Sequence, residues 1–171
     1  MSQKPGYDVI IEGEAGLMSI TGESGGSPVK VGVAITDLST GLYTHGAILA
    51  ALLDRYKTGL GQKIDVSLLE CQVAGLANIA HSHLIGGVKA QKWGTQHASI
   101  VPYQAFKTSD GHIVIGAGND RQYESLCHAI GRPDLVQDER FSNNSNRVKH
   151  REELVSCTYE DTLWDSIAHL Q

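Results

Sequence analysis

The most regular apolar pattern in the first half of the chain covers residues 36–58. Apolar side chains recur there at the three- and four-residue spacing of one helix face: Leu38, Leu42, Leu49, Leu52, Leu53 and Tyr56. Thr36 or Asp37 is predicted to be the N-cap of this helix, because both residue types accept hydrogen bonds from free helical N–H groups. Gly59 follows the last turn and is typical of a C-terminal cap.

A second apolar helix is predicted to follow a short strand. Ser67 and Glu70 form an S-x-x-E capping box at its start, and Gly86 ends it. Both helices are apolar around most of their circumference, so we expect each to be buried on more than one side. Gly41 and Gly46 weaken the interior of the first helix and indicate close approach by another helix or a ligand.

The remaining elements are shorter. They are a helix over 7–18, an extended segment over 29–35, a strand over 63–66, a hairpin of 103–107 and 112–116, and helices over 119–130, 146–157 and 159–170. Asp110-Gly111 is the turn signal of the hairpin, and Asn119 or Asp120 is predicted to cap the helix that follows it. The change from glycine- and alanine-rich helices to a hairpin with polar helices predicts a domain boundary near residue 90.

Composition excludes several classes of protein. The chain has 171 residues, of which 41% are hydrophobic, and a formal net charge of −5. No apolar run reaches the length of about 20 residues that a membrane span needs. The mild acidity argues against a nucleic-acid partner. Cys71, Cys127 and Cys157 are far apart and are expected to be reduced thiols rather than disulfides.

Common catalytic and cofactor motifs are absent from the sequence. His81 and His83 stand two residues apart, which places them on different faces of a helix, so we expect no metal site. Residues 22–26 lack the pattern of a phosphate-binding loop, and residues 116–118 lack the third glycine of a dinucleotide-binding motif. No G-x-S-x-G nucleophile motif occurs.

Asp37 is the carboxylate of greatest chemical interest. Most acidic residues at a helix start only cap the helix, and that interpretation remains open here. The alternative is that the free N–H groups and the positive end of the helix dipole keep Asp37 ionised. Ser39, Thr40 and Gly41 are small enough to leave room for a ligand. An open, ionised carboxylate is what covalent catalysis through an acyl-aspartate needs.

A family resemblance extends along the chain in collinear order. The segments that carry it are residues 6–8, 33–42, 54–62, 101–106, 109–111 and 116–119. They resemble the class III CoA-transferase family, and within it the branch of succinate–glutarate (hydroxymethylglutarate) CoA-transferases. The family also contains α-methylacyl-CoA racemases.

The resemblance implies a reaction for Asp37. The Asp at this position attacks the acyl-CoA thioester, which gives an acyl-aspartyl anhydride and releases CoA as the thiolate. The thiolate returns to form an aspartyl-CoA thioester, from which an acceptor carboxylate displaces it. CoA thereby passes from one (di)carboxylic acid to another, with the CoA thioester as substrate and no further cofactor.

The resemblance also implies substrate-binding roles for Tyr7, Gly94 and His97. Tyr7 stands where racemases have a proton-transferring histidine, and a tyrosine hydroxyl is a poor base at neutral pH, which favours transfer over racemisation. Gly94 begins a loop that corresponds to a glycine-rich loop closing over the nucleophile in formyl-CoA transferases. A backbone donor there could stabilise an oxyanion. His97 lies in the same loop, where a surface histidine is the alternative.

The implied fold is a partial class III CoA-transferase fold of the α/β class. Residues 1–90 would form the helical part of the large domain, and residues 91–171 a linker loop with part of the small α+β domain. The implied assembly is an interlocked homodimer. Acyl-CoA and a small carboxylic acid are the expected partners, and no nucleic acid or membrane is expected.

The length suggests an incomplete enzyme. Members of the family are much longer and bind much of CoA with an N-terminal half, so we expect a fragment that is inactive alone. Two alternatives stay open, namely proton exchange like that of α-methylacyl-CoA racemases and a non-catalytic fragment that acts only through dimerisation. The first residues show no signal peptide or presequence. A mitochondrial or cytoplasmic location is expected from the resemblance alone.

Overall fold

The chain divides into two compact units, Met1–Gly94 and Thr95–Gln171, whereas the sequence predicted a division near residue 90. The structure is a computed structural model that describes residues 5–108 and 111–158. The turn residues 109–110 and the helix expected over 159–170 lie outside the described residues. The first unit is helical, and the second combines a two-stranded sheet with helices.

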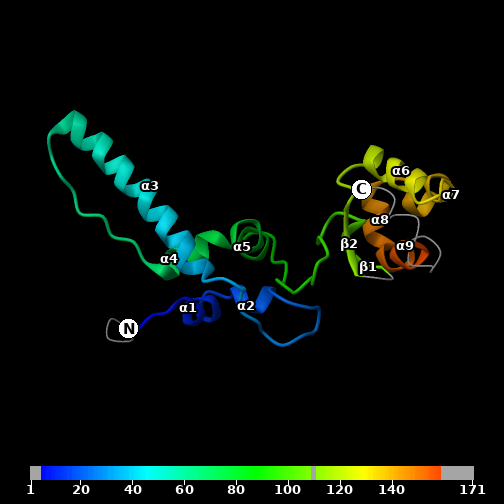
Figure 1. Cartoon of the computed structure of the whole chain (residues 1–171), viewed down its shortest axis with the longest axis horizontal. Helices are drawn as coiled ribbons and strands as arrows, with labels where there is room; N and C mark the ends of the chain where they lie inside the picture. Colours follow the sequence, from blue (N-terminus) through cyan, green and yellow to red (C-terminus); the bar gives the residue numbers. More distant parts are fainter. Residues whose placement is uncertain (1–4, 109–110, 159–171) are drawn as a thin grey trace. The chain divides into compact units, whose positions relative to one another are not determined.

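The described part of the first unit is built from helices joined by extended segments (Figure 1). They are α1 (Asp8–Glu14), α2 (Leu17–Ile20), α3 (Ile35–Thr58), α4 (Leu68–Gly75) and α5 (Ala77–Leu84). The start of α3 packs against α1 and α4. Residues 59–67 return from the end of α3 to the start of α4 as an extended segment.

The predicted ends of α3 were half right. Gly59 terminates it in the left-handed conformation, with φ of 77°, and donates its N–H to the Arg55 carbonyl at 2.8 Å. The N-cap, however, is Ala34, so the prediction of Thr36 or Asp37 as the cap was wrong. Both residues lie inside the first turn, because another part of the chain supplies the acceptor for their N–H groups.

Other local predictions in this unit had mixed outcomes. The capping box is confirmed, since the Ser67 hydroxyl accepts from the Glu70 N–H at 3.2 Å. The helix after it is broken before Ala77, whose φ is 44°, and the first predicted helix is broken at Gly16, whose φ is 88°. The segment predicted as a strand, 63–66, and the segment predicted as extended, 29–35, pair with no strand in the described part of the chain, so β-propensity there had no ladder to join.

The expectation that the two long helices are buried on several sides was wrong for this chain. Thr36 is the buried residue of α3, whereas Leu42 and Tyr56 are 73% and 88% exposed. A Cβ on Gly41 or Gly46 would meet no other part of the described chain within 4 Å, so no described element approaches these glycines closely. The reason is geometric, because the described contacts of α1 and α4 with this 24-residue helix involve its first half, from Thr36 to Ala47.

The second unit has its own core. Its elements are β1 (Tyr103–Lys107), β2 (His112–Gly116), α6 (Asp120–Ala129), α7 (Asp134–Gln137), the 3-10 helix Glu139–Phe141, α8 (Asn144–Lys149) and α9 (Arg151–Thr158). The predicted hairpin is confirmed, with Tyr103 opposite Gly116 and Lys107 opposite His112. Asn119 caps α6 as expected. His150 interrupts the helix expected over 146–157.

A buried arginine joins the parts of this unit. The Arg147 side chain is fully buried; its guanidinium donates to the carbonyls of Val101 at 2.8 Å and Phe141 at 3.1 Å, and to the Asp120 carboxylate at 2.7 Å. It lies over the Tyr123 ring, 4.3 Å from the centroid. One side chain thus ties together the hairpin entrance, the 3-10 helix and the start of α6.

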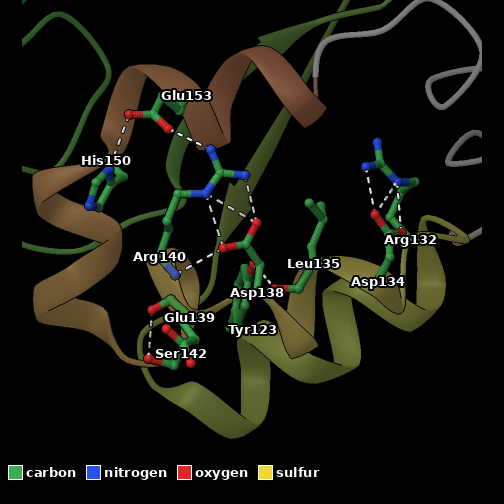
Figure 2. Close-up of polar contacts among 10 residues, drawn as sticks. All are labelled: Tyr123, Arg132, Asp134, Leu135, Asp138, Glu139, Arg140, Ser142, His150 and Glu153. Carbon is green, nitrogen blue, oxygen red and sulfur yellow. Dashed lines mark hydrogen bonds and ion pairs between the residues drawn. The ribbon is translucent and has the colours of Figure 1, made fainter.

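A second charged network lies on the outside of the same unit (Figure 2). Arg140 binds the Asp138 carboxylate at 2.6 Å and the Glu153 carboxylate at 2.8 Å, and Glu153 also binds His150 at 3.0 Å. The hydrogen bond from Arg140 holds the pKa of Asp138 below its usual value. The pKa of Glu153 is also lowered, chiefly by the hydrogen bond from His150. Through Arg140, Glu153 of α9 is joined to Asp138 in the segment before the 3-10 helix.

Arg147→Ala is expected to lower the free energy of unfolding of the second unit by about 3 kcal/mol, because two buried carbonyls lose their donor. Arg121→Ala is the matched control, since Arg121 is exposed on α6, and it should change stability by less than about 0.5 kcal/mol. Urea unfolding followed by circular dichroism measures both. Equal stabilities of the two variants would contradict the role given to Arg147.

Candidate active site

Asp37 lies in the first turn of α3 with its side chain exposed. None of the described residues forms a hydrogen bond or ion pair with its carboxylate, so both oxygens face solvent or a ligand. The helix begins two residues earlier, at Ile35, which puts Asp37 at its third position. The negative charge therefore sits at the positive end of the helix dipole.

The backbone of Asp37 is held by a residue that the sequence did not single out. The Asp8 carboxylate accepts from the N–H of Thr36 at 2.7 Å and from the N–H of Asp37 at 3.2 Å, both through Oδ1. These N–H groups belong to the first turn of α3 and have no partner within the helix. Asp8 is thus the functional cap of α3, supplied from α1 across 28 positions of sequence.

Two buried contacts fix the same place, the corner at which the N-terminus of α3 meets α1 and α4. The Thr36 hydroxyl, which is fully buried, donates to Gln72 Oε1 on α4 at 2.7 Å. Glu12, one helical turn after Asp8, accepts the Val31 N–H at 2.9 Å and holds the segment that leads into α3. The N-terminus of α3 is therefore attached to both α1 and α4, directly beside Asp37.

Tyr7 is brought to this corner by its neighbour. It precedes Asp8, is 65% exposed, and accepts the N–H groups of Ile10 and Ile11 at the start of α1. Because the Asp8 carboxylate accepts from the Asp37 N–H, the start of α1, which follows Tyr7, is joined to the start of α3, which contains Asp37. The Tyr7 side chain itself packs little in this chain.

Gly94 is bound to the loop that contains Gly22 and Glu23. Its N–H donates to the Gly22 carbonyl at 3.0 Å, its φ is 58°, and a Cβ there would lie 2.8 Å from Glu23 Oε2. Lys92 binds the carbonyls of Gly26 and Ser27 in the same loop. Glycine is thus required at position 94 by backbone conformation and by Glu23. The structure shows no contact between Gly94 and Asp37.

His97 belongs to the second unit, where its loop is firmly bound. Its N–H donates to the Tyr103 carbonyl at 2.9 Å, and Arg151 donates to its carbonyl at 2.9 Å. Ring Nδ1 accepts the Ser99 N–H at 3.1 Å, which places the proton of the neutral ring on Nε2. Asn144 binds the Ser99 carbonyl at 2.8 Å. These contacts bind the loop to β1, α8 and α9.

Two hollows of the first unit do not include Asp37 in their lining. A cavity of about 420 Å³ is lined mainly by apolar residues of α2, α4 and α5. A groove of about 630 Å³ runs along α3, lined by Ser39, Leu42, Tyr43, Gly46, Ala47 and Ala50. At about 100° per residue these positions face away from Asp37. The candidate site is therefore the helix corner itself.

Two further searches covered the residues that the structure describes. Within residues 5–108 and 111–158, no group of three or more His, Cys, Asp or Glu side chains is arranged to hold a metal ion. In the same part of the chain, no helix has both the length and the apolar character to cross a membrane.

Comparisons with known proteins show the family to which the chain belongs. Residues 1–160 match the family model described as CoA-transferase family III. The chain is 51% identical over 160 residues to the human succinyl-CoA:glutarate CoA-transferase and 42% identical over 158 residues to the succinate–glutarate CoA-transferase of Agrobacterium fabrum. Those alignments cover 94% and 92% of this chain, but 36% and 40% of the relatives. The chain thus spans somewhat over a third of their length.

A solved structure gives the same result for the fold. A CaiB/BaiF family protein from Brucella suis superposes with a TM-score of 0.80 at 41% identity, covering 99% of this chain and 46% of that one. A helical unit with a small sheet, as part of a larger fold, is thus shared between them. The chain belongs to CoA-transferase family III. The expected family and fold are confirmed.

Asp37→Asn is expected to change the free energy of unfolding by less than about 1 kcal/mol, because the exposed carboxylate is bound by no described residue. Thr36→Val, at the neighbouring position, should cost about 1–3 kcal/mol, since it leaves the buried Gln72 oxygen without its donor. Urea unfolding of both variants measures the difference. A larger loss for Asp37→Asn than for Thr36→Val would contradict the geometry.

Proposed function

We propose that Asp37 is the nucleophile in the transfer of CoA from an acyl-CoA to a small dicarboxylic acid. The observation that carries the proposal is an exposed, unpaired carboxylate on a fixed backbone, in a chain of CoA-transferase family III. A carboxylate that is spent on no internal hydrogen bond is free to attack a thioester carbonyl. Its fixed backbone lowers the entropy lost in reaching that carbonyl.

Each step of the proposed transfer exchanges one bond for another. An Asp37 oxygen bonds to the acyl carbon while the carbon–sulfur bond breaks, which leaves an anhydride and the CoA thiolate. The thiolate attacks the aspartyl carbonyl and releases the donor acid, which leaves an aspartyl-CoA thioester. An acceptor carboxylate then displaces the thiolate to form the second anhydride. The thiolate finally takes the acceptor acyl group and restores Asp37.

The relatives suggest the substrates. The human and mouse relatives are named for succinyl-CoA and glutarate, and the Agrobacterium relative for succinate and glutarate. We therefore propose succinyl-CoA as donor and a short dicarboxylate such as glutarate as acceptor. In this proposal Tyr7 orients the acyl group beside Asp37, and Gly94 and His97 contribute to substrate binding from their loop. A mitochondrial location is proposed on the same likeness to mammalian relatives.

The exposed apolar surface of α3 supports a further part of the proposal. Leu42, Leu53 and Tyr56 are each at least 60% exposed, and such a surface is typical of a protein interface. We propose that α3 is covered in an interlocked homodimer, with residues 1–90 in the large domain and residues 91–171 in the linker and small domain.

The trapping experiment uses the protein that carries this chain, succinyl-CoA and hydroxylamine. Hydroxylamine should convert the acylated Asp37 to a hydroxamate that peptide mass spectrometry detects at this residue. Asp37→Asn should lose the adduct and lower the transfer rate by about 10³-fold or more. Glu14→Gln, which alters an exposed carboxylate of α1, is the matched control and should keep both. Transfer that survives in Asp37→Asn would refute the assignment.

Proton exchange distinguishes the other chemistry of the family. With a 2-methylacyl-CoA in D₂O and no acceptor acid, a transferase should leave the α-proton in place. Exchange of that proton, together with no CoA transfer in a separate assay that supplies succinyl-CoA and glutarate, would overturn the proposal in favour of racemisation. Neither exchange nor transfer, in a protein that forms dimers, would instead identify a non-catalytic interaction fragment.

A further inference from the structure

Asp37 stands at a helix position from which an acidic side chain can bind backbone N–H groups. The N–H groups at a helix start lack internal partners, and an Asp side chain can hydrogen-bond to its own or a neighbouring backbone N–H. Asp37 occupies that position, since α3 begins at Ile35. Nevertheless, its carboxylate is exposed, and the described residues offer it no hydrogen bond.

Another carboxylate accepts from the N–H groups of Thr36 and Asp37. Asp8 Oδ1 accepts from the Thr36 N–H at 2.7 Å and from the Asp37 N–H at 3.2 Å. We propose that Asp8 is a positioning residue, which occupies the amide groups at the start of α3 and thereby leaves the Asp37 carboxylate free to attack. This inference rests on the proposed function of Asp37 and assigns the device that keeps its nucleophile available.

The surroundings of Asp8 suit a positioning role. Glu12 follows it by one helical turn and accepts the Val31 N–H at 2.9 Å, so α1 holds the approach to α3 at two points. The Thr36 hydroxyl is bound to Gln72 at 2.7 Å, so the residue before Asp37 cannot move independently of α4. The Asp8 contact therefore joins a rigid corner, and its removal should change the orientation of one carboxylate rather than the whole helix.

Kinetics of two Asp8 variants test the inference in the protein that carries this chain. Asp8→Ala should lower kcat about 10- to 100-fold, because the Asp37 carboxylate turns back to the vacated N–H groups, while KM for succinyl-CoA stays within about twofold. Asp8→Asn keeps an acceptor oxygen and should restore kcat to within about fivefold of the original. Unchanged kcat in Asp8→Ala would overturn the inference.

Ser67→Ala separates positioning from stability. Ser67 caps α4 in the same unit through the Glu70 N–H, so its loss removes a helix cap of the same kind without touching Asp37. We expect Ser67→Ala to lower the melting temperature by an amount similar to Asp8→Ala, but to leave kcat unchanged. An equal fall of kcat in both variants would show that Asp8 acts only through stability.

Hydrogen exchange gives a readout that does not depend on the reaction. In the original protein the amides of Thr36 and Asp37 should be protected, and Asp8→Ala should accelerate their exchange about tenfold or more while Asp8→Asn retains most protection. Unprotected amides in the original protein would overturn the inference. If protection follows Asp8 but Asp37→Asn still transfers CoA, the proposed function fails while the cap itself stands.

Discussion

The contact between the Asp8 carboxylate and the first amide groups of α3 determines the arrangement of the candidate site. A helix start must find acceptors for its free N–H groups, and here a residue from α1 supplies them. The same contact attaches Tyr7 and Asp37 to one corner of the first unit. It also means that Asp8 caps α3 in place of Asp37, the residue that we propose as the nucleophile.

The two units differ in what stabilises them. The second unit is organised around Arg147, whose buried guanidinium satisfies two backbone carbonyls and one carboxylate. The first unit leaves much of α3 in contact with solvent, and its buried contacts gather where α1, α3 and α4 meet. The candidate nucleophile therefore lies where these polar contacts gather, in a unit whose long helix is otherwise largely exposed.

Local sequence signals predicted those features that depend on neighbouring residues. The Ser67–Glu70 capping box, Gly59 at the end of α3, the hairpin register and Asn119 as the cap of α6 all follow from contacts within a few positions. The prediction that Asp37 lies at the start of α3 was correct, but the prediction that Asp37 or Thr36 caps this helix was wrong. The family and fold rested on segments spread along the whole chain, and the comparisons confirm them.

Features that depend on distant contacts could not be predicted in the same way. Asp8 was visible only as part of a Gly-Tyr-Asp segment, and nothing local showed that it reaches Thr36. The extended segment over 29–35 was predicted from alternating valines, but the pattern did not show that the Glu12 side chain binds this segment through the Val31 N–H. The sequence does contain one indication, the pair Asp8 and Glu12. Two carboxylates one turn apart on a helix repel each other, which indicates that each has a binding partner elsewhere.

The most direct test of the central claim follows an oxygen atom. In a single turnover with succinyl-CoA and glutarate labelled with ¹⁸O in its carboxylates, the anhydride route leaves one labelled oxygen on the side chain of Asp37. Mass spectrometry of the peptide that contains Asp37 should therefore find one ¹⁸O in that carboxylate. An unlabelled Asp37 after complete transfer would contradict the claim that this carboxylate carries the acyl group.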